Sequence, residues 1–121
     1  MIRLDKTTTK LEGVLNDTGA DVIFTVSWFE STQESADNQP TRGATTITAS
    51  NGTNDVTIAA APLINVTKNI DYICVYNGNA ATRIVTIQID DGGTNRIQVA
   101  ISLATTESAV WTPGAGWTIT T

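Results

Sequence analysis

Apolar and polar residues alternate on both sides of one turn in the C-terminal half of the chain. The turn has the sequence Asp90-Asp91-Gly92-Gly93. The apolar positions are Val85, Ile87 and Ile89 before the turn, and Ile97, Val99, Ile101 and Leu103 after it. Alternation with a period of two gives each strand one apolar and one polar face, as in an antiparallel sheet that faces water on one side. The pattern therefore predicts a β-hairpin.

Similar short segments follow one another along the chain, and no stretch of ten or more residues shows helical periodicity. The expected strands are residues 11–15, 22–29, 45–49, 56–60, 69–76, 83–90, 97–103, 110–111 and 117–120. Eight or nine strands at spacings of about 8–12 residues are typical of sandwiches and barrels. The sequence predicts an all-β protein, an antiparallel and jelly-roll-like β-sandwich.

The first ten residues are set apart from this pattern. Ile2 and Leu4 face one way, and a polar stretch follows them. So short a segment is not expected to bury two apolar side chains by itself. The prediction is an N-terminal arm over residues 1–10, with Ile2 and Leu4 packed on a neighbouring subunit or a partner, and a single sandwich domain over residues 11–121. Deletion of residues 1–9 is expected to leave the fold intact.

Residues 30–43 form a long polar stretch between two predicted strands. Loops of this length in compact domains are usually functional or mobile. Glu30, Glu34 and Arg42 are therefore candidate partner-binding residues. After it, Asn51-Gly52 is a hairpin signal between the strands expected at residues 45–49 and 56–60.

The composition excludes several kinds of chemistry. The 121 residues contain one cysteine, Cys74, and no histidine. An internal disulfide is therefore impossible, and the commonest general base and transition-metal ligand is absent. Twelve acidic and seven basic residues give a net charge of −5, which disfavours binding to nucleic acid. No segment reaches the ~20 apolar residues that span a bilayer. We expect no catalytic residue, cofactor, metal, membrane or nucleic-acid partner.

Three groups of side chains invite a functional interpretation. Asp90 and Asp91 are expected to form the turn, with a weak cation site as the alternative. Cys74 is expected to leave the sheet on the face opposite Ile73 and Val75, and to be structural. Trp111 and Trp117 flank the last turn as possible cross-strand neighbours. They are either packed or a platform for a sugar ring or partner chain, whereas Trp28 is expected in the core.

The chain from residue 45 onward carries a further pattern. Its segments are Thr57-Ile58-Ala59-Ala60-Ala61-Pro62, Asn69-Ile70-Asp71-Tyr72-Ile73-Cys74-Val75-Tyr76-Asn77, Val85-Thr86-Ile87-Gln88-Ile89-Asp90-Asp91, and Ser108-Ala109-Val110-Trp111 with Gly116-Trp117. These segments resemble small β-sandwich virion proteins of tailed bacteriophages. The opening Met1-Ile2-Arg3-Leu4-Asp5 is similar to the start of several such proteins.

The resemblance implies a structural protein of the virion rather than an enzyme. Members of this group are associated with capsid decoration or cementing and with neck and tail attachments. The expected function is decoration of the capsid by docking on its outer surface, with the major capsid protein or another virion protein as partner. A homo-oligomer is expected, a trimer by analogy, in a virion assembled in the host cytoplasm. The alternative is a neck, tail or fibre-associated module that recognises a carbohydrate or host receptor through Trp111 and Trp117.

Overall fold

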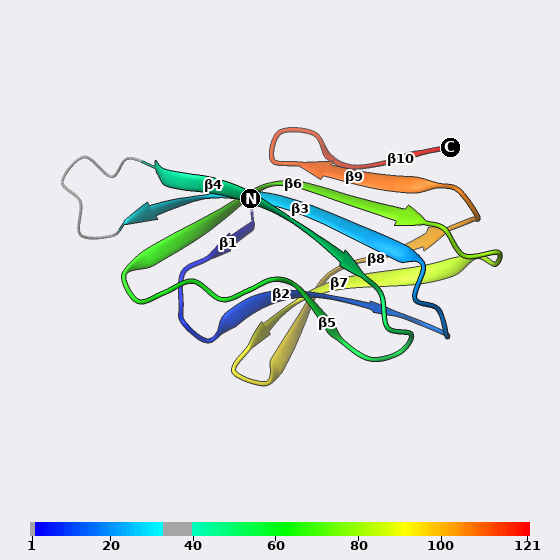
Figure 1. Cartoon of the computed structure of the whole chain (residues 1–121), viewed down its shortest axis with the longest axis horizontal. Coiled ribbons are helices and arrows are strands. Elements are labelled where there is room, and N and C mark those ends of the chain that lie inside the picture. The colour runs from blue at the N-terminus through cyan, green and yellow to red at the C-terminus, as the bar shows by residue number, and fades with distance from the viewer. Residues whose placement is uncertain (1, 33–39) are drawn as a thin grey trace.

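The computed structural model describes residues 2–32 and 40–121, and for residues 32 and 40–42 it describes the backbone. The described chain forms ten strands and no helix (Figure 1). The strands are β1 (Ile2–Leu4), β2 (Thr9–Leu15), β3 (Val22–Thr32), β4 (Pro40–Ala49), β5 (Val56–Ala59), β6 (Val66–Asn77), β7 (Arg83–Asp91), β8 (Thr94–Leu103), β9 (Ser108–Thr112) and β10 (Gly116–Thr120).

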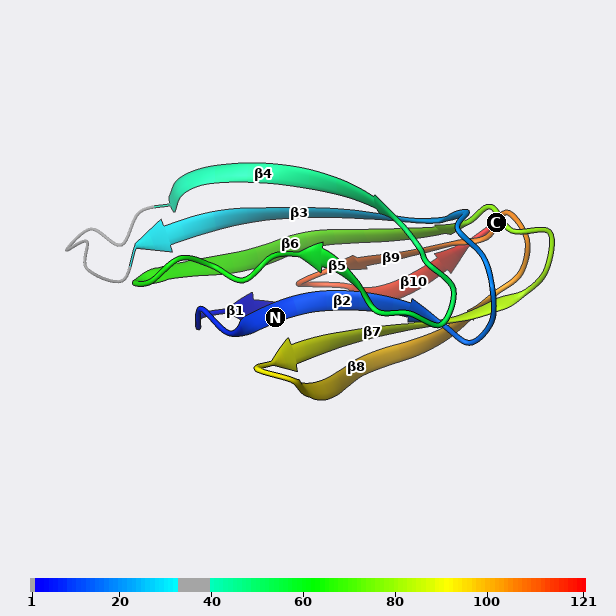
Figure 2. The same cartoon turned by 60° about the horizontal axis from the view of Figure 1, so that its bottom comes forward.

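The strands form two antiparallel sheets that lie one over the other (Figure 2). The larger sheet has the order β10-β9-β6-β3-β4, with β1 added beside β6, and the smaller sheet has the order β5-β2-β7-β8. The strand pairs are nested along the chain. Strands β3 and β6 pair in the larger sheet, and β2 and β7, which lie before and after them in the sequence, pair in the smaller sheet. The predicted antiparallel β-sandwich is confirmed, with ten strands where eight or nine were expected.

The hairpin predicted at Asp90–Gly93 is present. Strand β7 ends at Asp91, which pairs Thr94, the first residue of β8. Gly92 and Gly93 form the two-residue loop with φ values of 62° and 99°. A two-residue loop with both φ values positive matches the right-handed twist of the flanking strands, and glycine adopts this conformation without a steric penalty.

A bulge in this hairpin changes the face on which one apolar residue lies. Ile87 pairs Val99, but the next residue, Gln88, pairs Ile97, so Gln98 is left over between the pairs. One extra residue in a strand reverses the alternation, so the side chains on its two sides no longer share the face that a strict period of two would give them. Ile97 is 68% exposed, so the prediction that it shares the buried face of Ile101 is wrong.

The two sheets enclose one apolar core. Its largest fully buried side chains are Phe24, Leu4, Leu11, Ile58, Ile70, Ile73, Ile87, Leu103, Val22, Val26, Val75 and Val85. Phe24 of the larger sheet lies directly against Gly13 of the smaller sheet, where an added Cβ would be 2.5 Å from the ring atom Cζ. A residue without a side chain at position 13 therefore makes room for the aromatic ring.

Gly13→Ala is expected to lower the free energy of unfolding by about 1–3 kcal/mol, because the new methyl group overlaps the buried ring of Phe24. Urea denaturation followed by tryptophan fluorescence measures the change. Gly114→Ala is the matched control, since its Cβ would meet no atom within 4 Å. An equal loss in both variants would show that overlap with the ring of Phe24 does not cause the effect.

The first residues of the chain are part of the sandwich rather than an arm. Strand β1 pairs antiparallel with residues 68–70 of β6, on the edge that β9 leaves open by pairing only residues 73–76. Ile2 is 7% exposed and Leu4 is fully buried in the core. The long strand β6 offers a partner that the sequence does not reveal. The prediction that Ile2 and Leu4 pack on a neighbour is therefore wrong, and deletion of residues 1–9 would remove two side chains from the core.

Two connections also differ from expectation. The predicted loop over residues 30–43 is shorter, because β3 continues to Thr32 and β4 begins at Pro40, with Glu30 opposite Arg42. The turn at Asn51-Gly52 exists, with Gly52 at φ 59°, but it does not close a hairpin. It carries the chain from β4 in the larger sheet to β5 in the smaller one.

Candidate functional site

The structure describes the candidate residues of the polar stretch only in part. Glu30 is half-buried on β3, where the register places it between Arg42 on β4 and Lys68 on β6. The side chain of Arg42 lies outside the described part of the chain, and so does the whole of Glu34. Glu30 and Arg42 belong to paired strands, so the sequence-based assignment of both residues to a loop is wrong.

Lys68 serves the structure of the sandwich. It is a buried lysine, and its Nζ donates a hydrogen bond of 2.8 Å to the carbonyl oxygen of Ala60. The same ammonium lies 4.5 Å from the centroid of the Trp28 ring, which is the geometry of a cation–π contact. Trp28 is buried, as predicted, and its Nε1 has no hydrogen-bond partner in the described structure. Lys68 thus ties the connection after β5 to the core.

Trp111 and Trp117 do not form an exposed aromatic platform. They are cross-strand partners in the β9–β10 hairpin, as the sequence suggested. Trp111 is buried in the core at 7% exposure, and Trp117 is half-buried and packs against it. A sugar ring needs an accessible aromatic face. Trp111 is therefore a packing residue, and the half-buried Trp117 by itself does not make a platform of two rings.

Cys74 lies on the side of the larger sheet that faces away from the core, opposite to buried Ile73 and Val75, as predicted. The hydroxyl of Tyr72, two residues earlier on the same face, donates a hydrogen bond to the sulfur of Cys74. This hydrogen bond, followed by desolvation, raises the pKa of Tyr72 above its ordinary value. The cross-strand neighbours of Cys74 are Thr25 and Val110. Both are uncharged, so neither activates the thiol.

The carboxylates of the hairpin turn hold neighbouring loops. Asp90 Oδ1 accepts a 2.7 Å hydrogen bond from the amide of Gly93. Asp91 accepts 2.9 Å from the hydroxyl of Thr8, and Lys6 Nζ lies 3.4 Å from its other oxygen. The hydrogen bond from Thr8 has the largest effect, and together with Lys6 it lowers the pKa of the Asp91 carboxyl below its ordinary value. Within residues 2–32 and 40–121, no three His, Cys, Asp or Glu residues are grouped to hold a metal ion.

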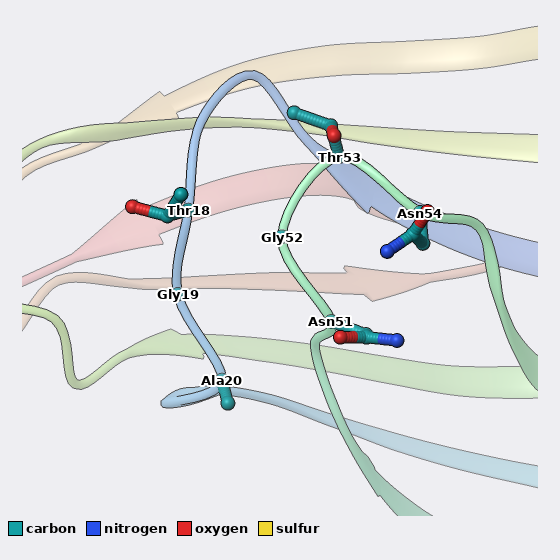
Figure 3. A pocket seen from close by; sticks show the side chains of 7 residues that line it. All are labelled: Thr18, Gly19, Ala20, Asn51, Gly52, Thr53 and Asn54. Carbon is teal, nitrogen blue, oxygen red and sulfur yellow. The ribbon is translucent and has the colours of Figure 1, made fainter.

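A shallow depression lies at one end of the sandwich, between the β2–β3 and β4–β5 connections (Figure 3). Its volume is about 300 Å³, and its lining is Thr18, Gly19, Ala20, Asn51, Gly52, Thr53 and Asn54. The two connections bond each other directly, because the amide of Gly52 donates 2.8 Å to the carbonyl of Gly19. Side chains of Thr18 and Asn51 extend in opposite directions in Figure 3. The lining contains no charged side chain, and none of its residues is a base that could activate the hydroxyls of Thr18 and Thr53, so the depression offers little to transform a ligand.

The most exposed apolar side chains lie at the other end of the molecule. Leu63 is 75% and Ile64 is 77% exposed, and we name this pair the apolar tip. It sits on a tight turn, in which the amide of Val66 donates 3.1 Å to the carbonyl of Leu63. Asn65 closes the turn at φ 60°, a conformation that asparagine tolerates better than most residues. Val66 pairs Thr32, so the tip lies beside the end of β3 (Figure 2).

The sequence reasoning missed the apolar tip, although a signal was available. Leu63 and Ile64 are adjacent, so alternation cannot bury both, and they lie between Pro62 and Asn65, two residues common in turns. Large aliphatic residues at a turn favour either a core contact or a docking contact. Their exposure in the structure excludes a core contact.

The described part of the chain contains no helix long and apolar enough to cross a bilayer. Comparison with models of protein families, with curated proteins and with solved structures finds no match to the chain.

Proposed function

We propose that this chain is a structural protein of a bacteriophage virion that decorates the capsid by docking on its outer surface. The sequence resemblance suggests the virion, and the apolar tip is the single structural observation that carries the docking. Under this proposal its partner is the major capsid protein or another virion protein. The chain then acts as a rigid, non-enzymatic module that is assembled into particles in the host cytoplasm.

The size and place of the apolar tip suit an anchor. Leu63 and Ile64 stand on a hydrogen-bonded turn at the end of a packed sandwich, so little ordering is needed when they bind. Burial of each side chain contributes about 1.5–3 kcal/mol before the cost of association. One such anchor binds weakly, but copies that are joined in an oligomer gain strength through effective concentration when they dock together on a repetitive lattice.

The reactive side chains of the described chain support a structural role in another way. Asp90 and Asp91 bond the turns around them, and Lys68 bonds a carbonyl group and stacks on a tryptophan ring. Each is satisfied by the fold. Catalysis would need a nucleophile, a base and an oxyanion donor that converge on one depression. The residues that line the depression in Figure 3 do not supply a base.

The proposal is tested on purified particles of the phage whose genome encodes the chain. Mass spectrometry should find the chain in the virion in a fixed ratio to the major capsid protein. Absence of the chain from intact particles, while it is abundant in the infected cell, would overturn the proposed function.

The double variant Leu63→Ser with Ile64→Ser is expected to weaken capsid binding at least about tenfold, because it removes the apolar contact area of the tip. Co-sedimentation with capsids purified from phage that lack the gene measures the binding. Stability should change by less than about 0.5 kcal/mol, since both side chains are exposed. Ile97→Ser, at a position that is 68% exposed on β8, is the control and should bind normally. Equal binding by all three proteins would exclude the tip as the anchor.

The alternative, a neck, tail or fibre-associated module for a carbohydrate or receptor, relied on Trp111 and Trp117. Both rings pack with the core, so no observation favours this second candidate.

A further inference from the structure

One row of side chains crosses the whole larger sheet on the side away from the core. The strand register places one residue of each strand in the row, in the order Ile47, Thr25, Cys74, Val110 and Thr118. Cys74 is the middle residue, because β6 is the central strand of this order. The row is continuous from one edge of the sheet to the other.

Two further rows flank the first on the same side. On one side, the register aligns Ala49, Ile23, Tyr76, Ser108 and Thr120. On the other side, it aligns Thr45, Ser27 and Tyr72. We name the three rows together the outer face. None of its residues is buried, and Ile47 and Tyr76 are 73% and 40% exposed.

The outer face contains no charged residue, although the chain as a whole has a net charge of −5. Two exposed charges lie beside it, Arg3 on β1 and Asp71 at the bulge of β6. They are opposite in sign and cancel. The excess of negative charge is therefore carried by other parts of the molecule.

The smaller sheet has a different outward side. Lys10 Nζ lies 3.3 Å from Glu12 and 3.8 Å from Asp90, and Gln88 donates 3.1 Å to the Glu12 carboxylate. These charges are paired within the chain, and the Glu12 carboxylate is itself buried beside Gln88. The outward side of the smaller sheet thus carries charged residues, whereas the three rows of the outer face carry none.

We propose that the outer face is the interface between two copies of this chain, packed face to face about a two-fold axis. The inference does not depend on the proposed virion function. The outer face has thirteen positions, on strands about 4.8 Å apart with a repeat of about 6.8 Å along each strand, and these cover about 420 Å² in projection. Two copies then bury about 850 Å² before the relief of the side chains is counted, which approaches the roughly 1,000 Å² of a specific interface.

Charge selects a second copy as the occupant. Two chains of net charge −5 repel each other, so they associate most easily through a surface that lacks the excess charge. A basic partner would instead be drawn to the acidic surfaces elsewhere. A neutral face of alternating apolar and hydroxyl side chains matches its own copy, and sheets pack in this way about 10 Å apart. This symmetry makes a dimer, whereas the sequence resemblance favoured a trimer.

The mass of the purified full-length chain, measured by light scattering after size exclusion, tests the proposal. We expect twice the chain mass at high concentration, and a dissociation constant raised at least about tenfold by Ile47→Glu, which places a charge in the interface of both copies. Ile97→Glu introduces the same charge at a similarly exposed position on the charged side and should leave the dimer intact. Circular dichroism checks that both variants fold.

Alkylation of Cys74 by a maleimide gives a second readout without any substitution. The thiol should react at least about fivefold more slowly at concentrations where the dimer forms than in dilute solution, and Ile47→Glu should remove this difference. A strict monomer, a trimer, a dimer that Ile47→Glu leaves unchanged, or an alkylation rate independent of concentration would overturn the proposal. Any of these outcomes leaves detection of the chain in virions unaffected, so the two proposals fail separately.

Discussion

Leu4→Ala is expected to lower the free energy of unfolding by about 3 kcal/mol, because it leaves a cavity in a core that the first strand helps to close. Leu4 is fully buried, although it is the fourth residue of the chain. Chemical denaturation with an unchanged slope against denaturant would report this loss as a lower midpoint. The effect would be large relative to the 5–15 kcal/mol that typically stabilises a protein domain.

Leu63→Ala is the matched control for this experiment, since it makes the same chemical change at a side chain that is 75% exposed. Its unfolding free energy should stay within about 0.5 kcal/mol of the unmodified protein. A similarly small effect of Leu4→Ala would mean that β1 is not docked on β6 in solution. Residues 1–10 would then be an arm, as the sequence alone predicted.

Asn77→Ala is expected to lower the free energy of unfolding by about 2–4 kcal/mol, because it breaks a buried network at the end of the sandwich. Asn77 is fully buried, and its Nδ2 donates 2.8 Å to the carbonyl of Leu103 and 3.1 Å to that of Ala81. Its Oδ1 accepts 2.9 Å from the amide of Asn79. Removal of the side chain leaves the buried carbonyl of Leu103 without this partner, and the partly buried groups of Ala81 and Asn79 without theirs.

Two further variants separate the hydrogen bonds from the cavity. Asn77→Asp keeps the size and the acceptor but loses both donated bonds and buries a charge, so it should be at least as unstable as Asn77→Ala at pH 7. Asn95→Ala changes the same residue type at an exposed position on β8 and should have little effect. Denaturation midpoints measure all three. If Asn77→Asp were as stable as the unmodified protein, the donated bonds would not matter to the fold.

Local patterns predicted the parts of the fold that depend on local chemistry. The Gly92-Gly93 turn was predictable because its backbone conformation favours glycine. Alternation along residues 69–76 predicted which side chains enter the core, because a pleated strand has a period of two. Trp28 belonged to the alternating pattern predicted over residues 22–29, and it is buried.

The errors arise where a distant segment decides the outcome. Ile97 turned outward because of a bulge against β7, which depends on how two strands pair. Strand β1 formed because the edge of β6 was free over residues 68–70. The turn at Asn51-Gly52 was recognised, but its conformation does not specify which sheet the next strand joins.

The candidate surfaces follow the same division. The residues proposed for docking from sequence, Ile2, Leu4 and Trp111, are large apolar side chains, and they are buried. A search for conspicuous hydrophobic residues finds core residues first, because the core needs them most. Leu63 and Ile64 were distinguished only by their exposure. The neutral outer face consists of isolated positions on five strands, which become neighbours only in the sheet.

By itself the sequence determined an all-β sandwich, the β7–β8 turn and the apolar faces of its strands, because backbone preference and side-chain period act between residues close in the chain. Only the tertiary structure decided that residues 2–4 complete the larger sheet, that the tryptophan pair packs with the core, and that uncharged side chains from five strands line up in the outer face. These features depend on strand pairing between segments far apart in sequence. Such pairing selects among edges and faces that look alike in the sequence.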